Sequence, residues 1–301
     1  MKVLNFGSLN LDFVYDVPHF VRPGETLSSD ALNTFRGGKG LNQSVALSRA
    51  GAEVYHAGCI GEDGRMLLDG LAEAGADVSL VRTLPDCRTG HAIIQVDPSG
   101  QNCILLYGGA NRAITPEQIS ETLANFGEGD VLLLQNEVNG LTQMMGEARS
   151  RGMRIAFNPS PIDEEISQLP LENVEFFLLN EIEGAALGGG EKPEDILEGL
   201  KRRYPGAKII LTLGKEGALY FDGTETFRQP VFPVKAVDTT AAGDTFTGYF
   251  LEAVGRGLDG GACLRRASAA SAIAVSRKGA SPSIPDAAEV DAFLRERESN
   301  S

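Results

Sequence analysis

Basic residues are scarce in this sequence of 301 residues, which has 27 Lys+Arg against 41 Asp+Glu and a formal net charge of −14. A protein that binds the phosphate backbone of nucleic acids needs a basic face, and an anionic membrane surface repels an acidic chain. We therefore expect neither a nucleic acid nor a membrane as a partner. Hydrophobic residues make up 42% of the chain, which is enough for a sizeable core and argues against intrinsic disorder.

Cysteine and histidine are also rare. Cys59, Cys87, Cys103 and Cys263 form no CxxC pair, and the three histidines have no metal-ligand spacing. We expect free, mostly buried thiols and no zinc site. The first residues, MKVLNFGSLNLDF, contain no signal-peptide pattern, and no apolar run approaches the ~20 residues of a membrane span. The expected location is the cytoplasm.

Three common phosphate and catalytic motifs are missing. Gly38-Lys39 is followed by Gly and Gly214-Lys215 by Glu, so neither pair belongs to a GxxxxGK[ST] motif. The first predicted strand is followed by no GxGxxG, and GxSxG does not occur. These absences argue against a P-loop NTPase, a dinucleotide-binding dehydrogenase and an α/β-hydrolase.

Short apolar runs alternate with helical patterns along most of the chain, and this order predicts one α/β domain over residues 1–301. Its central sheet should be mostly parallel and covered by helices on both faces. The predicted strands are Val3–Phe6, Val54–Cys59, Val131–Gln135, Arg154–Asn158, Phe176–Asn180 and Lys208–Leu213. The predicted helices are Asn42–Arg49, Leu67–Ala74, Pro116–Asn125, Leu141–Ser150, Pro193–Tyr204, Thr245–Val254 and Gly261–Ser276.

Two segments, about 12–36 and 90–108, break this alternation. The second contains two alternating runs separated by Pro98-Ser99-Gly100, which is typical of a hairpin. We interpret both segments as one small antiparallel sheet, a lid beside the main body; an extension of the main sheet's edge is the alternative. Its apolar residues need a cover, which a second subunit could provide. These residues include Val14, Val17, Ile93, Ile104 and Leu106.

The stretch DTTAAGDTF at residues 238–246 places small residues between Asp238 and Asp244 and leads into an amphipathic helix. Small residues at a helix start let an anion approach free backbone N–H groups. A carboxylate beside an anion is unusual unless it handles a proton or a metal. The simpler alternative is that Asp244 only caps the helix.

Three further polar clusters are candidates for ligand contact. The Gly-rich stretch at 37–40 carries Lys39 and is followed by Asn42, although it could be only a turn. Asn10 and Asp12 follow the first strand and suit two neighbouring hydroxyls, or else form an Asx turn. Residues 180–183, Asn-Glu-Ile-Glu, end an apolar strand and fit either a metal-water contact or helix capping.

Together these stretches resemble the ribokinase (PfkB) family of sugar and nucleoside kinases. The resemblance covers nearly the whole chain: GSLNLD, FRGGKGLNQSVALSRAG, LLLQNE, FNPSP, LLNEIE, LTLGKEG, DTTAAGDTF and AVSRKGASPSIP. It is closer to the ribokinase branch than to fructokinases or adenosine kinases. It implies ATP-dependent phosphorylation of the primary hydroxyl of a free sugar, D-ribose first, and a homodimer formed through the lid.

The resemblance also implies roles for individual residues. Asp244 would be the catalytic base, with the amides of Ala241, Ala242 and Gly243 and its own amide forming an anion hole. The sugar would be held by Asn10, Asp12, Gly38, Lys39, Asn42 and Glu137. ATP would contact Asn180, Thr212, Gly214, Lys215, Glu216, Gly217, Gly243 and Ser268, and Glu183 would hold Mg²⁺ through water. A K⁺ ion would be held by Asp238, Thr240, Ala274, Arg277, Gly279 and Ser283.

One departure from the family pattern concerns the nucleotide. Ser268 is small where ribokinases often have a larger polar residue beside the adenine, which leaves the nucleotide preference open. The alternatives are a family kinase for deoxyribose, fructose or a nucleoside, and a sugar- or nucleotide-binding protein that has lost turnover. Carboxylates at Asp12 and Glu137 accept hydrogen bonds from hydroxyls and would repel a phosphorylated sugar, which favours a free one.

Overall fold

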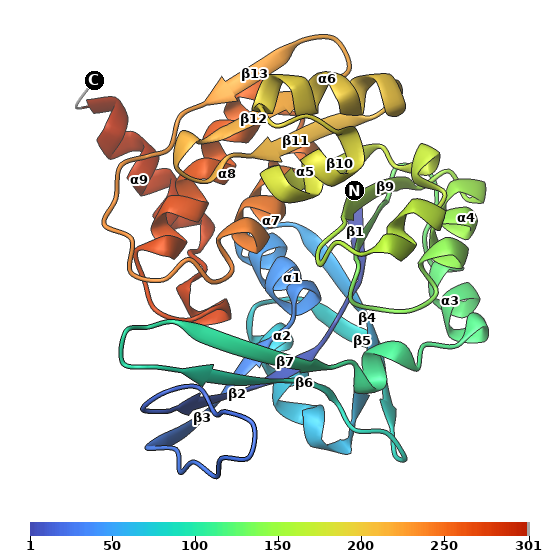
Figure 1. The fold of residues 1–301 in the computed structure, drawn as a ribbon. Coiled ribbons are helices and arrows are strands. Elements are labelled where there is room, and N and C mark those ends of the chain that lie inside the picture. The colour runs from blue at the N-terminus through green and yellow to red at the C-terminus, as the bar shows by residue number, and fades with distance from the viewer. Residues whose placement is uncertain (300–301) are drawn as a thin grey trace.

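The computed structural model describes residues 1–299, and a nine-stranded sheet forms the centre of this part of the chain (Figure 1). Strand pairing is parallel throughout except at one edge, where β12 and β13 are antiparallel to their neighbours. The mostly parallel sheet predicted from the alternating pattern is therefore confirmed. In spatial order the strands are β13 (Thr226–Gln229), β12 (Ala218–Phe221), β11 (Lys208–Thr212), β10 (Phe176–Asn180), β9 (Arg154–Asn158), β8 (Val131–Gln135), β1 (Lys2–Phe6), β4 (Glu53–Gly61) and β5 (Asp77–Leu84).

Helices cover both faces of this sheet. Successive strand residues point to opposite faces, so each face is apolar and forms a core with the helices packed on it. In β8, Val131 and Leu133 belong to one core, and Leu132 and Leu134 belong to the other. The first core is completed by α1 (Lys39–Ala50), α2 (Arg65–Glu73), α7 (Ala242–Gly255), α8 (Gly260–Val275) and α9 (Ala287–Ser299). The second is completed by α3 (Pro116–Leu123), α4 (Leu141–Ser150), α5 (Glu181–Gly188) and α6 (Pro193–Arg203).

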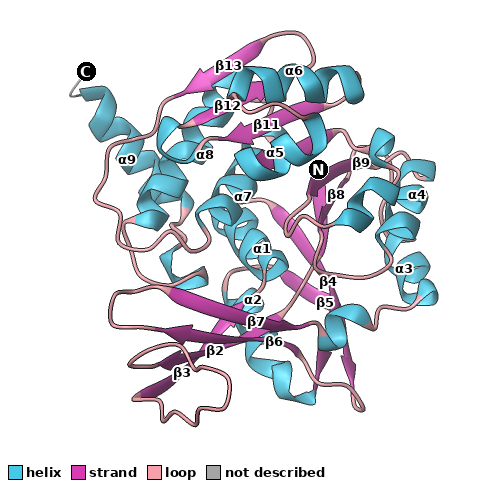
Figure 2. Cartoon of the chain, viewed as in Figure 1, coloured by secondary structure: helices cyan, strands magenta, loops and turns pink. Residues whose placement is uncertain are grey.

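A separate four-stranded sheet stands beside the main body, and Figure 2 shows the two groups of strands apart. Its spatial order is β3 (Ala31–Gly37), β2 (Asn10–Asp16), β6 (Gly90–Val96) and β7 (Asn102–Tyr107). The predicted lid is thus confirmed as a sheet of its own. Its two hairpins are antiparallel as predicted, but they join through a parallel pairing of β2 with β6, which the sequence did not indicate.

Two boundaries matter for the site. The helix predicted at Thr245 begins at Ala242, so Asp244 lies in the first turn of α7, and the helix predicted at Asn42 begins at Lys39. Glycines and short polar residues are weak helix formers, so their presence in these first turns made the predicted helices start three residues too late. The elements β5, β12, β13 and α9 were not predicted, and α5 was expected only through the capping alternative at residues 180–183; β12 and β13 have only four residues each, and α5 is short and glycine-containing.

The cysteines are free, as expected, but only Cys59 and Cys263 are buried. Cys103 is exposed on β7 and Cys87 is partly exposed, so the expectation of mostly buried thiols was wrong for these two. None of the helices within residues 1–299 combines the length and apolar character needed to cross a bilayer.

Candidate active site

The start of α7 is shaped by an unusual backbone conformation at Ala241. Its φ of 59° lies in the left-handed region that non-glycine residues rarely adopt. The turn lets the amide of Ala242 donate to the carbonyl of Thr239 at 3.2 Å and the amide of Thr245 donate to Ala241 at 2.8 Å. Among the described residues, the amides of Gly243 and Asp244 have no such acceptor, so these two N–H groups remain available to an anion.

The carboxylate of Asp244 is buried, with 7% of the residue exposed, and both of its oxygens accept hydrogen bonds from α1. The Asn42 Nδ2 donates to Oδ2 at 3.1 Å and the Gln43 Nε2 donates to Oδ1 at 2.9 Å. Helices α1 and α7 can approach this closely because α7 has Gly248 at the crossing, where an added Cβ would lie 2.4 Å from the Cβ of Ala46. Asp244 is therefore held by side chains and does not serve as the N-cap of α7.

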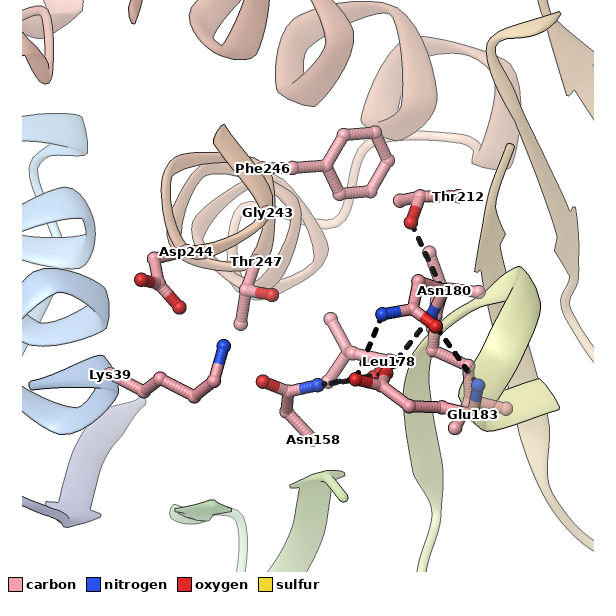
Figure 3. A pocket seen from close by; sticks show the side chains of 12 residues that line it. Lys39, Asn158, Leu178, Asn180, Glu183, Thr212, Gly243, Asp244, Phe246 and Thr247 are labelled. Atoms are coloured by element: carbon pink, nitrogen blue, oxygen red, sulfur yellow. Dashed lines mark hydrogen bonds between the residues drawn. The ribbon is translucent and has the colours of Figure 1, made fainter. Parts of the chain in front are cut away.

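The side chain of Lys39 points into a cavity that also contains Asp244, as Figure 3 shows. Burial acts to lower the pKa of Lys39, but the negative charges of Asp244, Glu137 and Glu183 outweigh it and leave the pKa raised. Lys39 is therefore a cation at neutral pH. Its backbone amide donates to Oε2 of Glu137 at 3.0 Å. Lys39 therefore lines the cavity with its side chain and contacts a predicted sugar-binding residue with its backbone.

The predicted sugar-binding residues meet where β2 of the lid leaves the main body. Glu137 also accepts a hydrogen bond from the hydroxyl of Ser8, and Asn10 accepts one from Asn111 Nδ2 at 2.7 Å. The carboxylate of Asp12 lies over Gly37, since a Cβ there would lie 2.0 Å from the Asp12 Oδ2. The structure thus brings together Asn10, Asp12, Gly38, Lys39, Asn42 and Glu137 near the junction of the lid and α1.

Two carboxylates among these residues, Asp12 and Glu137, are in surroundings that disfavour their charged form. Burial, followed by the charge of Glu137, raises the pKa of Asp12 to about 7. Burial also raises the pKa of Glu137, against the opposing hydrogen bond from Ser8 and charge of Lys39. A ligand whose neutral hydroxyls donate hydrogen bonds, and which brings no further negative charge, would suit this pair of carboxylates.

The cavity beside Asp244 is partly open to solvent. It lies between the start of α7 and the carboxyl ends of β9, β10 and β11, where ligands of parallel sheets usually bind. The residues that line it are Lys39, Asn158, Leu178, Leu179, Asn180, Glu183, Ile210, Thr212, Gly243, Asp244, Phe246 and Thr247.

Asn180 and Glu183 line this cavity and also cap α5. The Asn180 side chain accepts from the amide of Glu183 at 2.9 Å, and the Glu183 carboxylate accepts from the Asn180 amide at 3.0 Å and from its Nδ2 at 2.9 Å. The capping alternative is therefore correct as a description of their bonding, and their place in the cavity leaves a ligand role open.

The other predicted nucleotide residues are spread over two elements. Thr212 lines the cavity, whereas Gly214, Lys215 and Glu216 are exposed on the turn after β11, with Gly217 following them. Ser268 is 9% exposed on α8 and does not line the cavity. On the same helix, Ser271 donates to the carbonyl of Ala242 at 3.1 Å and braces the start of α7.

The predicted cation residues bring two loops together through Asp238. Its carboxylate accepts from the amide of Thr240 at 2.9 Å and from the amide of Gly279 at 2.9 Å. Burial would raise the pKa of Asp238, but these hydrogen bonds outweigh it and lower the pKa. The hydroxyl of Ser283 donates to Ala280 at 2.8 Å. Within residues 1–299, no cluster of three or more His, Cys, Asp or Glu side chains could hold a metal ion.

Sequence reasoning missed several residues of this region. Ser8 and Asn111 orient Glu137 and Asn10, while Phe246 and Thr247 line the cavity. Gln43 and Asn158 stood inside quoted motifs without a role. Except for the apolar Phe246, their common signal is a polar side chain in an otherwise apolar, buried stretch, which is informative only once the contacts are known.

The site defines a class: an α/β phosphotransferase that uses a helix start in place of a P-loop. Comparison with known proteins agrees with it. The model of the pfkB family carbohydrate kinases matches residues 1–287, so the chain belongs to this family and is a sugar kinase.

Individual relatives cover almost the full chain. A ribokinase from Haemophilus influenzae is 34% identical over 296 residues, which are 96% of each protein. The structure of a ribokinase from Thermotoga maritima superposes with a TM-score of 0.86 at 34% identity and covers 98% of this chain and 99% of that one. The structure of Arabidopsis thaliana ribokinase complexed with ribose and ATP has a TM-score of 0.86 at 30% identity, with 98% of both chains covered.

Proposed function

We propose that the protein transfers the γ-phosphoryl group of ATP to the primary hydroxyl of free D-ribose, which gives ribose 5-phosphate. One observation carries the proposal: the buried Asp244 lies between a cluster of hydroxyl-binding side chains and a cavity that contains Lys39 and the open amide of Gly243. A relative crystallised with ribose and ATP, similar over 98% of the chain, supports this choice of substrates.

Asp244 would act as the base on the ribose hydroxyl. Its two oxygens accept hydrogen bonds from Asn42 and Gln43, which fixes the carboxylate beside the predicted sugar-binding residues. The transition state of phosphoryl transfer is loose in most analyses, so the hydroxyl proton leaves late and the position of the base matters more than its basicity. Asp244 takes the proton as the new O–P bond forms and the bond to ADP breaks.

Negative charge on the transferring group would be stabilised by the open amides of Gly243 and Asp244 and by Lys39. The amides are fixed before the reaction begins, because the left-handed turn at Ala241 orients them. The Lys39 ammonium points into the same cavity from α1 (Figure 3). The nucleotide would extend from there past Asn180 and Thr212 toward the turn at 214–217 and α8, where Ser268 lies.

A free sugar fits better than a sugar phosphate. Asp12 and Glu137 lie close enough for the charge of Glu137 to raise the pKa of Asp12, and a phosphate would add further negative charge. Hydroxyl groups instead donate to carboxylates, and the unpartnered buried Oδ1 of Asn42 adds one more acceptor. The cluster of predicted sugar-binding residues thus offers hydrogen-bond acceptors to the hydroxyls of a polyol.

Two metal ions are implied by the family. Glu183 lines the cavity, and its carboxylate keeps lone pairs for a water on Mg²⁺ beyond those used by Asn180. The candidate metal ligands near Asp238 are its carboxylate, backbone carbonyls and the Ser283 hydroxyl. They are all oxygen atoms, which suits K⁺. Mg²⁺ would neutralise phosphate charge, and K⁺ would brace the loop before α7. The carbonyls would come from Thr240, Ala274, Arg277 and Gly279.

A homodimer through the lid is the proposed assembly. Side chains alternate between the faces of a sheet, so Leu106 and Phe35 share the face of Asp12, whereas Leu105 shares the opposite face with Phe13. Phe13 packs against the core of the main body, while Leu106 and Phe35 are 55% and 44% exposed. A second lid over the face of Asp12 would bury them and cover the sugar.

This register corrects the expected apolar face. Ile104 lies on the face of Asp12, but Ile93 lies on the other face, and Val17 is buried outside the strands. Val14 pairs with Ile94, which pairs with Ile104, so these three share the face of Asp12.

A coupled assay with ATP across ribose, deoxyribose, fructose and adenosine tests the substrate. Ribose should give the highest kcat/KM. If another acceptor is preferred by about tenfold, roughly 1.4 kcal/mol of transition-state preference, the assignment to ribose is wrong. Measurable binding of ATP and ribose without turnover would instead favour a binding protein on the same fold.

A further inference from the structure

Gln43 is a fully buried glutamine directly behind the carboxylate of Asp244, and its amide makes three hydrogen bonds. Its Nε2 donates to Asp244 Oδ1 at 2.9 Å and to Asn158 Oδ1 at 3.1 Å. Its Oε1 accepts from Gln135 Nε2 at 2.7 Å. A primary amide has two N–H donors, and both of them are used.

The orientation of this amide is fixed from the side of Asn158. The Nδ2 of Asn158 donates to the backbone carbonyl of Leu178 at 2.9 Å, as Figure 3 shows. A carbonyl oxygen can only accept, so the NH₂ group of Asn158 faces Leu178 and its oxygen faces Gln43. Gln43 must therefore present its NH₂ group in return.

An independent chain of bonds imposes the same orientation from the other side. The Nδ2 of Asn5 donates to the backbone carbonyl of Gly40 at 2.8 Å, which turns the Asn5 Oδ1 toward Gln135. Gln135 Nε2 donates to that oxygen at 3.1 Å and gives its second hydrogen to the oxygen of Gln43. The Gln43 oxygen is thus occupied, and only its NH₂ can face Asp244.

The far end of this chain is uncharged. Asn5 gives its second hydrogen to Ser44 Oγ at 2.8 Å, and Ser44 lies 2.8 Å from Nδ1 of His56. Burial lowers the pKa of His56 to about 4, against a backbone hydrogen bond with Gly7 that raises it, so its ring is neutral around pH 7. The network delivers a fixed donor to Asp244 without adding a charge near it.

We propose that Gln43 is a positioning residue for Asp244, a role that rests on the proposed function. Gln43 holds Oδ1 while Asn42 holds Oδ2, so the plane of the carboxylate cannot rotate. A carboxylate has about four lone-pair sites, and the two left over remain free to accept from the sugar hydroxyl. Because neighbouring hydrogen bonds in a buried network polarise one another, the anchored amide holds Asp244 more firmly than a solvent-exposed one would.

The test compares Gln43→Met with Gln118→Met. Gln118 is a matched control: it is also a buried glutamine with an amide hydrogen bond, to the carbonyl of Gly58 at 2.9 Å, but it lies on α3 away from the site. Gln43→Met should lower kcat with ribose at least tenfold and change the KM for ribose and ATP less than threefold. Gln118→Met should lose comparable thermal stability and keep its kcat.

A second variant covers the case in which Gln43→Met does not fold. Gln43→Glu preserves the shape of the side chain but places a carboxylate against Asp244. Its kcat relative to the unsubstituted protein should be lowest near pH 8 and rise toward pH 6, where the introduced carboxyl is protonated more often and can donate. The other charged or titratable groups around this position are Lys39, Glu137, Glu183 and His56, and they are common to both proteins.

Three outcomes would overturn the proposal: a kcat of Gln43→Met within threefold of Gln118→Met, a loss confined to KM, or a kcat ratio for Gln43→Glu that is independent of pH. None of them would touch the proposed function, which fails separately if the unsubstituted protein does not phosphorylate ribose. A large fall in kcat with unchanged KM would support the positioning role.

Discussion

The two sheets of the molecule differ in how their faces are covered. Every strand from β8 to β11 is buried among side chains of two cores, whereas all six residues of the lid strand β7 are exposed. The main sheet is complete within one chain, because helices pack on both of its faces. The lid has one face that packs partly on the main body through Phe13, whereas the apolar residues on the face that bears Asp12 belong to neither core.

The residues of the candidate site are divided between these two regions. Asp244, Asn42 and Gln43 lie on helices that belong to the main core, so their geometry is set by packing of the single chain. Asp12 lies on the lid, where burial and a neighbouring carboxylate disfavour its charge. The proposed reacting end is therefore formed by packing within the main body, whereas the proposed sugar end also depends on the lid. Changes in the two regions should have different consequences.

The largest expected effect is on the rigid side, with Asp244→Asn. The substitution keeps the size of the side chain, and the Asn42 amide can turn its unpartnered Oδ1 toward the new NH₂ group, so the free energy of unfolding should change by less than about 1 kcal/mol. Turnover should fall by roughly 10²–10⁴-fold, because a positioned acid–base group is lost, while ATP binding survives. The measurements are kcat, nucleotide affinity and thermal unfolding. A folded variant with more than about a tenth of the original kcat would show that Asp244 is not the base.

On the lid, Leu106→Glu should weaken the proposed dimer at least a hundredfold, about 2.7 kcal/mol, because it would bury a charge in the interface. Leu105→Glu is the matched control, since Leu105 is 67% exposed but lies on the opposite face. Light scattering at micromolar concentration should give a monomer for the first variant and a dimer for the second. A monomer for the unsubstituted protein, with and without ribose, would disprove the dimer.

The same contrast explains what the sequence could predict. Strands β8, β9 and β10 were predicted to the residue, because short apolar runs bounded by polar residues identify strands that are buried on both faces. The lid was predicted as one small antiparallel sheet made of two segments. Its parallel joint between β2 and β6 depends on contacts between segments about 80 residues apart, and no local pattern records them.

At the site, the residue types were predictable and their hydrogen-bond partners were not. Small residues before Asp244 indicated an anion site, but the left-handed Ala241 and the earlier start of α7 appear only in the backbone. The importance of Gln43 was invisible in the sequence, where a glutamine in a helix is usually a solvated residue. Its burial follows from the packing of α1 against α7, which is a tertiary property.

A smaller effect is expected at Asp12, on stability. Its pKa is about 7 in the folded protein against an ordinary value of 3.8, so the folded state binds more protons between these values and loses stability as pH rises through this window. Asp12→Asn removes that cost and should stabilise the ligand-free protein at pH 8 by on the order of 1–4 kcal/mol. The gain should vanish toward pH 4. Urea unfolding at pH 4.5, 6 and 8 measures it; equal gains at all three would refute the explanation.

The smallest effect should come from potassium, because the proposed cation lies behind the reacting atoms. Asp238 ties the loop before α7 to the loop at Gly279, and a cation among their carbonyls would hold the turn at Ala241 in place. Replacing potassium by tetramethylammonium at constant ionic strength should lower kcat by roughly three- to thirtyfold, equivalent to about 1–2 kcal/mol. Asp238→Asn should give the low rate in both salts. Since no substrate contact changes, the KM for ribose should stay constant, and equal rates of the unsubstituted protein in both salts would mean that no cation acts there.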